Sequence, residues 1–64
     1  MRVQEARRRF KDMDRQHRRV FTSGDLRKFY PQDSDKAIAD GIARLIASGD
    51  LERPAKGLYV YANT

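Results

Sequence analysis

The large apolar residues of this chain change their spacing at Gly49. Before this glycine they recur three and four positions apart, which is the spacing of an amphipathic helix. After it they alternate with other residues in Leu51-Glu52-Arg53 and in Leu58-Tyr59-Val60-Tyr61, which is the spacing of a β-strand. Residues 54–57 between the two runs include a proline and a glycine. We therefore expect a four-residue turn that closes a C-terminal β-hairpin over residues 51–61.

Local signals set the ends of the helices that are predicted before this hairpin. Thr22 and Asp25 have the spacing of a capping box, which starts a helix. Pro31 disfavours helical geometry at the residue before it, and Ser34 is a favourable N-cap for the next helix. We therefore expect helices over about residues 2–16, 24–30 and 35–48, with a short strand over residues 20–22 after the first of them.

The predicted core is small, because 64 residues are near the lower limit for a single apolar core and no cysteine is present to form a disulfide. Almost every large apolar residue is therefore expected to pack inside. In the hairpin we expect the core to contain Leu51, Leu58 and Val60, and the other face to carry Glu52, Tyr59 and Tyr61. The inward residues expected on the helices are Val3, Ala6, Phe10, Met13, Leu26, Phe29, Tyr30, Ile38, Ile42, Leu45 and Ile46.

The order of the predicted elements is helix, short strand, helix, tight turn, helix and β-hairpin. This order predicts an α+β fold of the winged helix-turn-helix type, in which residues 1–64 form one domain and the hairpin is the wing. Gly41 lies inside the third helix, where glycine costs about 1 kcal/mol relative to alanine. We therefore expect another helix to cross close to it.

The positive charge is concentrated at the start of the chain. Residues 1–20 hold eight Lys and Arg against three acidic residues, a net +5, whereas residues 21–64 hold six against six. Such an excess favours a polyanionic partner, and nucleic acid is the first candidate. Arg15 and Arg19 are candidate phosphate contacts on this arginine-rich flank. The same flank is also compatible with a subunit interface or with a face that only keeps the protein soluble.

Four parts of the sequence carry a family resemblance: Val20-Phe21-Thr22 with Asp25-Leu26, Ala37-Ile38 with Ile42-Ala43-Arg44-Leu45, Gly49-Asp50-Leu51-Glu52-Arg53, and Lys56-Gly57-Leu58-Tyr59-Val60. In these parts the chain resembles the N-terminal winged-helix domain of AbiEi-type antitoxins and related small regulators. The resemblance implies DNA binding near a promoter and repression, often self-repression of an operon on a mobile element. Such antitoxins also carry a larger C-terminal domain that these 64 residues do not include, so the resemblance implies only the DNA-binding part of the role.

The third helix is the expected recognition helix, whose N-terminal part enters the major groove of DNA. Asp40 on its outer side repels DNA unless it accepts a hydrogen bond from cytosine or holds Arg44 in place. The expected DNA-binding residues are Ser34, Lys36, Ala39, Asp40, Ala43 and Arg44 on this helix, Arg53 and Lys56 on the wing, and Ser23 at the start of the second helix. An ordinary solvated helix face or edge hairpin also carries charges of this kind, so the pattern alone does not separate the two interpretations.

No catalytic or metal-binding apparatus is visible in the sequence. His17 is the only histidine, cysteine is absent and no glycine-rich phosphate loop is present, so we expect no enzymatic activity, no cofactor and no metal. No apolar run reaches the ~18 residues that a membrane span needs. We therefore expect a cytoplasmic protein, bacterial or phage-encoded, with no membrane partner.

Together these features predict a small transcriptional repressor or autoregulator that binds double-stranded DNA. A monomer of 64 residues offers one recognition helix, so we expect a homodimer on two half-sites, with the first helix as the dimer surface. Two alternatives remain. One is a winged helix that binds a protein partner, as a phage-type inhibitor or adaptor does. The other is RNA binding through the arginine-rich first helix.

Overall fold

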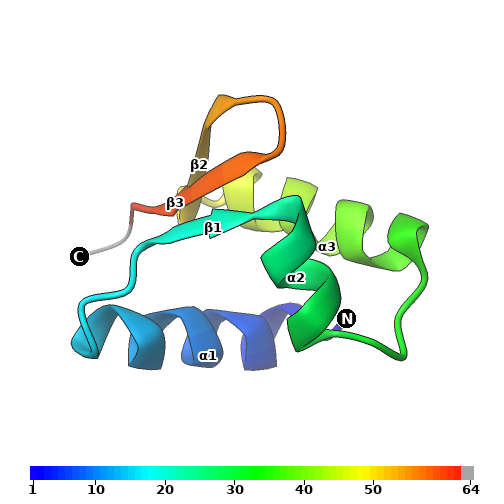
Figure 1. Cartoon of the computed structure of the whole chain (residues 1–64), viewed down its shortest axis with the longest axis horizontal. Coiled ribbons are helices and arrows are strands. Elements are labelled where there is room, and N and C mark those ends of the chain that lie inside the picture. Colours follow the sequence, from blue (N-terminus) through cyan, green and yellow to red (C-terminus); the bar gives the residue numbers. More distant parts are fainter. Residues whose placement is uncertain (63–64) are drawn as a thin grey trace.

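The computed structural model of the chain describes residues 1–62, and its elements follow the predicted order (Figure 1). The helices are α1 (Val3–Arg15), α2 (Ser23–Phe29) and α3 (Asp35–Ala47). The strands are β1 (Val20–Thr22), β2 (Leu51–Ala55) and β3 (Leu58–Tyr61), and they form one antiparallel sheet in the order β1-β3-β2. The predicted α+β arrangement of a winged helix-turn-helix is confirmed.

The helices α2 and α3 begin at the predicted caps. The Thr22 hydroxyl accepts a hydrogen bond from the Asp25 backbone N–H at 3.2 Å, and the Asp25 carboxylate accepts one from the Thr22 N–H at 3.0 Å. This hydrogen bond from the Thr22 backbone holds the pKa of Asp25 below its usual value. At α3 the Ser34 hydroxyl accepts a hydrogen bond from the Ala37 N–H at 3.1 Å. Both caps pair backbone donors that the first helical turn leaves without a partner.

The helices α1 and α3 both end in a Schellman motif, which contains one residue of positive φ. After α3 this residue is Gly49, with φ 86°, and its N–H donates to the Ile46 carbonyl at 3.1 Å. After α1 the same position is occupied by His17, with φ 65°, whose N–H donates to the Asp14 carbonyl at 2.9 Å. A Cβ atom is strained at positive φ, so His17 carries a cost that Gly49 avoids.

We expect His17→Gly to raise the free energy of unfolding by about 0.5–1 kcal/mol, because relief of this strain exceeds the entropy that glycine adds to the unfolded chain. In a domain of this size the melting temperature should rise by about 3–6 °C. Thermal unfolding followed by circular dichroism measures the change. His17→Ala is the control, since it keeps a Cβ at positive φ. An equal rise in both variants would show that φ strain is not the cause.

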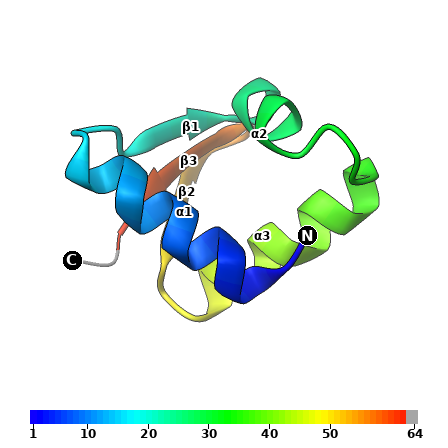
Figure 2. The ribbon, with the colours of Figure 1, turned by 90° about the horizontal axis from the view of Figure 1, so that it is seen from below.

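The three helices cover one face of the sheet. Seen from below, α1 crosses in front of the strands and α3 lies beside it (Figure 2). At the centre of the core the fully buried Phe21 packs edge-on against Phe10 and Phe29, with ring centroids 5.0 Å and 6.0 Å away. The other buried apolar residues are Ala6, Leu26, Ile38, Ile42, Leu45, Leu51 and Tyr61. The remaining residues predicted inward on the helices pack against this core and are partly buried: Val3, Met13, Phe29, Tyr30 and Ile46.

The pairing register decides which face of β3 meets the core. Phe21 lies opposite Tyr59, and Leu51 lies opposite Tyr61. Residues directly opposite each other in an antiparallel pair share a face of the sheet. Tyr61 is therefore buried beside Leu51, and Tyr59 packs against the core near Phe21. Burial raises the pKa of the Tyr61 hydroxyl above its usual value.

The opposite face of β3 was predicted to point inward, and that prediction was wrong. Leu58 and Val60 are only partly buried and lie on the outer face of the sheet, where Val60 pairs with Val20. Val20 is 54% exposed. All four residues of β3 are apolar or aromatic. Alternation alone therefore does not decide which pair of them faces the core. A shift of one residue in register exchanges the two faces.

Strand β2 is longer and the hairpin turn is shorter than predicted. β2 continues through Pro54 to Ala55, and the turn consists of Lys56 and Gly57, with φ 75° at the glycine. Proline is tolerated there because β2 is an edge strand whose register shifts between Glu52 and Ala55. The prediction of a four-residue turn was wrong, because two of its residues, Pro54 and Ala55, belong to β2.

A side chain, and not the crossing helix that was predicted, lies closest to Gly41. This glycine is buried in α3, which packs against α1. A Cβ added at Gly41 would lie 2.8 Å from the sulfur of Met1, which directly precedes α1. The Met1 side chain thus occupies the space that a larger residue would need.

Candidate nucleic-acid interface

One side of α3 is anchored in the core and the other side is exposed. Ile38, Ile42 and Leu45 are buried on the inner side. The residues of α3 and its N-cap that are expected to bind DNA are all exposed: Ser34, Lys36, Ala39, Asp40, Ala43 and Arg44. Among the described residues, Asp40 and Arg44 form no ion pair with each other or with a third residue. The outer face of α3 therefore offers a carboxylate and two cations whose charges are not neutralised by close partners.

An ion pair that the sequence did not reveal crosses the helix-turn-helix. The Arg27 guanidinium of α2 lies 3.4 Å from the carboxylate of Asp35, the first residue of α3. No helical spacing signals this pair, because the turn separates its members. Both side chains are well exposed, and exposed ion pairs contribute at most about 1 kcal/mol. Arg27 can therefore exchange Asp35 for a phosphate at small cost.

The wing turn lies beside the start of α2. The Ser23 backbone N–H donates to the Gly57 carbonyl at 3.1 Å, which fixes the exposed Lys56 near the first turn of α2. Ser23 and Ala39 line the same shallow cleft of about 130 Å³, formed by α2, α3 and β3. Arg53 is exposed on the edge strand β2 that leads to the turn. The fold thus brings together candidate residues from α2, α3 and the wing.

Arg15 and Arg19 lie apart from this group, at the other end of the sheet. The Arg19 guanidinium donates to the carbonyl of Tyr61, the last residue of β3, at 3.0 Å. It also pairs with Asp14 at 2.9 Å. Arg15 is exposed, and its guanidinium lies 3.9 Å from the carboxylate of Asp12. The structure does not bring these two arginines next to the wing turn.

Most arginines at the start of the chain have partners within the molecule. Arg9 donates to the Phe29 carbonyl at 2.9 Å and lies over the rings of Phe29 and Tyr30. Arg18 pairs with Asp25 at 3.4 Å and also lies over the Phe29 ring. The excess of positive charge in residues 1–20 is therefore partly committed to holding the fold. Less of it is free for a polyanion than the sequence suggests.

A buried carboxylate that the sequence did not single out supports this scaffold. Asp50, between α3 and β2, accepts hydrogen bonds from the Arg7 guanidinium and from the Ser48 hydroxyl, each at 2.6 Å. The ion pair joins α1 to the end of α3, the helix expected to contact DNA. An acidic residue after a helix-ending glycine has the pattern of an ordinary loop residue, and nothing in the sequence marks Arg7 as its partner.

Neither a metal-ligand cluster nor a membrane-spanning helix is found among the described residues. Within residues 1–62, no three side chains of His, Cys, Asp or Glu cluster closely enough to hold a metal ion. None of the helices α1 to α3 is long and apolar enough to cross a bilayer.

Comparison with known protein families identifies the family of this chain. A family model described as a transcriptional regulator, AbiEi antitoxin, matches residues 8–62. No curated protein and no solved structure matches the chain. The matched residues include most of α1 and all of the helix-turn-helix and the wing. The resemblance noted in the sequence is thereby confirmed over a longer stretch.

Proposed function

Because the chain belongs to the AbiEi family of transcriptional regulators, we propose that it binds double-stranded DNA sequence-specifically and represses transcription, its own operon included. The observation that carries this proposal is the hydrogen bond from the Ser23 N–H to the Gly57 carbonyl at 3.1 Å. It holds the wing turn beside the start of α2, which itself packs against α3. A duplex that receives α3 in its major groove then meets the wing turn and the start of α2 at its phosphates.

In this proposal the N-cap Ser34 and the exposed face of α3 as far as Ala43 read the bases. Ala39 and Ala43 are small enough for the backbone to approach closely, and their methyl groups can contact thymine methyl groups. Lys36 donates to guanine or to a phosphate. The Ser34 hydroxyl oxygen already accepts a hydrogen bond from the helix backbone, so its proton is free to donate to DNA. Asp40 accepts a hydrogen bond from cytosine and thereby selects against other bases.

The remaining candidates bind phosphates, which position the protein but do not read sequence. Lys56 and Ser23 contact the backbone at the wing turn, Arg53 extends this contact along β2, and Arg44 does so along α3. Arg15 and Arg19 are assigned to flanking phosphates only, since they lie at the other end of the sheet. Arg19 has to leave Asp14 to reach one.

We propose that the regulator acts as a homodimer in a bacterial cytoplasm, with no catalytic role of its own. One recognition helix reads few base pairs, and useful specificity requires two half-sites spaced by about one helical turn, or about 34 Å. A dimer places one copy of α3 at each of them.

A gel-shift titration with the gene's own upstream region tests the proposal against a random duplex of equal length. We expect a preference of at least about 10³-fold for the upstream region. If about four phosphates are contacted, raising salt from about 50 to 200 mM should lower the affinity about 100-fold. Equal affinity for both duplexes would contradict sequence-specific binding. Stronger competition by single-stranded RNA than by duplex DNA would assign the protein to RNA.

A further inference from the structure

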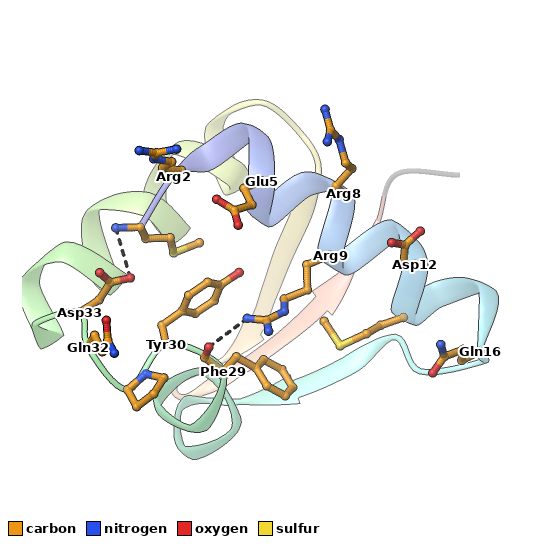
Figure 3. A pocket seen from close by; sticks show the side chains of 13 residues that line it. Arg2, Glu5, Arg8, Arg9, Asp12, Gln16, Phe29, Tyr30, Gln32 and Asp33 are labelled. Atoms are coloured by element: carbon orange, nitrogen blue, oxygen red, sulfur yellow. Dashed lines mark hydrogen bonds and ion pairs between the residues drawn. The ribbon is translucent and has the colours of Figure 1, made fainter.

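A groove runs between α1 and the turn that joins α2 to α3, and none of its lining residues belongs to the proposed DNA interface. It encloses about 930 Å³, with α1 on one side and residues 29–33 on the other (Figure 3). Part of the lining is apolar, from Met13, Phe29 and Tyr30. The Tyr30 hydroxyl is buried without a hydrogen-bond partner among the described residues, and it points toward α1 on the side of Glu5 and Arg9 (Figure 3).

The α1 side of this groove carries exposed charges of both signs, in the order Arg2, Glu5, Arg8, Arg9 and Asp12. Arg8 adds a second positive charge beside Arg9, and the other four residues alternate in sign. When these four residues are read from Asp12 back to Arg2, the charge at each position is opposite to the charge at that position in the forward order. A second α1 that runs antiparallel therefore places Arg2 opposite Asp12 and Glu5 opposite Arg9. Each contact occurs twice, as the twofold symmetry of a homodimer requires.

We propose that a second copy of this chain docks in the groove, with the two α1 helices antiparallel. The inference rests on the proposal above that the protein is a homodimer, and it names the surface that forms it. The apolar lining supplies buried area, and the order of the charges fixes direction and register. A polyanion fits the groove less well, because it meets the carboxylates of Glu5 and Asp12 as well as the arginines.

The size of the groove sets the expected strength of the dimer. Its 13 lining residues are fewer than the about 20–30 residues that each partner contributes to a standard interface. We therefore expect a dissociation constant on the order of 10–100 µM for the free protein. DNA with two half-sites holds two copies of the protein close together. Most dimers are therefore expected to form on the DNA.

Charge reversal at the outer contact tests the interface without DNA. Arg2 and Asp12 are ten positions apart, or about 15 Å along a helix, so they do not touch within one chain. Arg2→Glu or Asp12→Arg alone puts like charges at both symmetry-related contacts, and each should weaken dimerisation about tenfold. An equimolar mixture of the two variants forms a heterodimer with opposite charges at both contacts. Sedimentation equilibrium should find its affinity within about twofold of the wild type.

Lys11→Glu is the matched control, since it reverses a charge of the same helix at a position that does not line the groove. Its dissociation constant should stay within about twofold of the wild type, with circular dichroism checking that each variant keeps its helices. A mixture that associates no more strongly than the single variants would overturn the proposal, as would a wild-type protein that stays monomeric up to about 1 mM. Restored association in the mixture without DNA binding in the gel shift would support this interface and contradict the proposed function.

Discussion

Asp50→Ala is expected to lower the free energy of unfolding by about 2–4 kcal/mol. The substitution removes the buried carboxylate that joins Arg7 of α1 to the end of α3. Breaking a buried ion pair costs about 3–5 kcal/mol, and the partial exposure of Arg7 reduces this loss because water solvates its guanidinium. A single core of this size rarely supplies more than about 3–5 kcal/mol. A large fraction of the variant should therefore be unfolded at room temperature.

Urea denaturation followed by circular dichroism measures this change in unfolding free energy. Arg7→Met in the Asp50→Ala background should cost less than about 0.5 kcal/mol, because the interaction is already lost. The control is Asp40→Ala, which removes an exposed carboxylate of α3 and should change stability by no more than about 0.5 kcal/mol. Equal losses for Asp50→Ala and Asp40→Ala would show that the buried pair does not hold the helices together.

The double variant Lys36→Ala/Lys56→Ala is expected to bind the preferred duplex about 30–100-fold more weakly at about 100 mM salt. Each substitution removes one ammonium group, one from α3 and one from the wing turn. Neither lysine has an ion-pair partner among the described residues, so the fold should be unaffected. The slope of log affinity against log salt should become shallower by about 1.8 if both lysines contact phosphates. Fluorescence anisotropy at several salt concentrations gives both quantities.

Two single variants locate the interface on the surface. Lys11→Ala removes one exposed positive charge from α1 and should weaken DNA binding less than about threefold. Arg15→Ala tests the arginine-rich flank, where Arg15 is exposed and its pairing with Asp12 is long, at 3.9 Å. A loss from Arg15→Ala as large as that from Lys36→Ala would move the main phosphate contacts from α3 to α1.

Features that act within one turn of the chain could be predicted from the sequence. The Thr22–Asp25 capping box, the Ser34 cap and the glycine that ends α3 at Gly49 all lie where their spacing indicated. The exposure of the outer face of α3 also followed from the helical period, because Ile38 and its apolar neighbours fix the inner side. These local signals were sufficient for the order of elements and for the candidate residues on α3.

Features that depend on pairing across the chain could not be predicted. The face of β3 depends on its register with β1 and β2, and the sequence gives no direct measure of register in a strand as short as Leu58–Tyr61. Likewise, Arg7 and Asp50 are 43 positions apart. From the sequence alone both residues are expected to be exposed charges. The positive charge of α1 that is free to bind DNA is therefore overestimated. Packing, and not composition, determines which arginines remain available.

Chemical-shift mapping of the ¹⁵N-labelled protein with its preferred duplex tests most directly whether α3 and the wing bind DNA, because every backbone amide except those of the prolines reports. We expect the largest shifts in the first half of α3, at Ser23 and at Lys56-Gly57. The amides of α1 from Val3 to Arg15 should shift little, apart from changes that dimerisation causes without DNA. The largest shifts along α1, with α3 and the wing turn unchanged, would contradict a recognition surface formed by α3 and the wing.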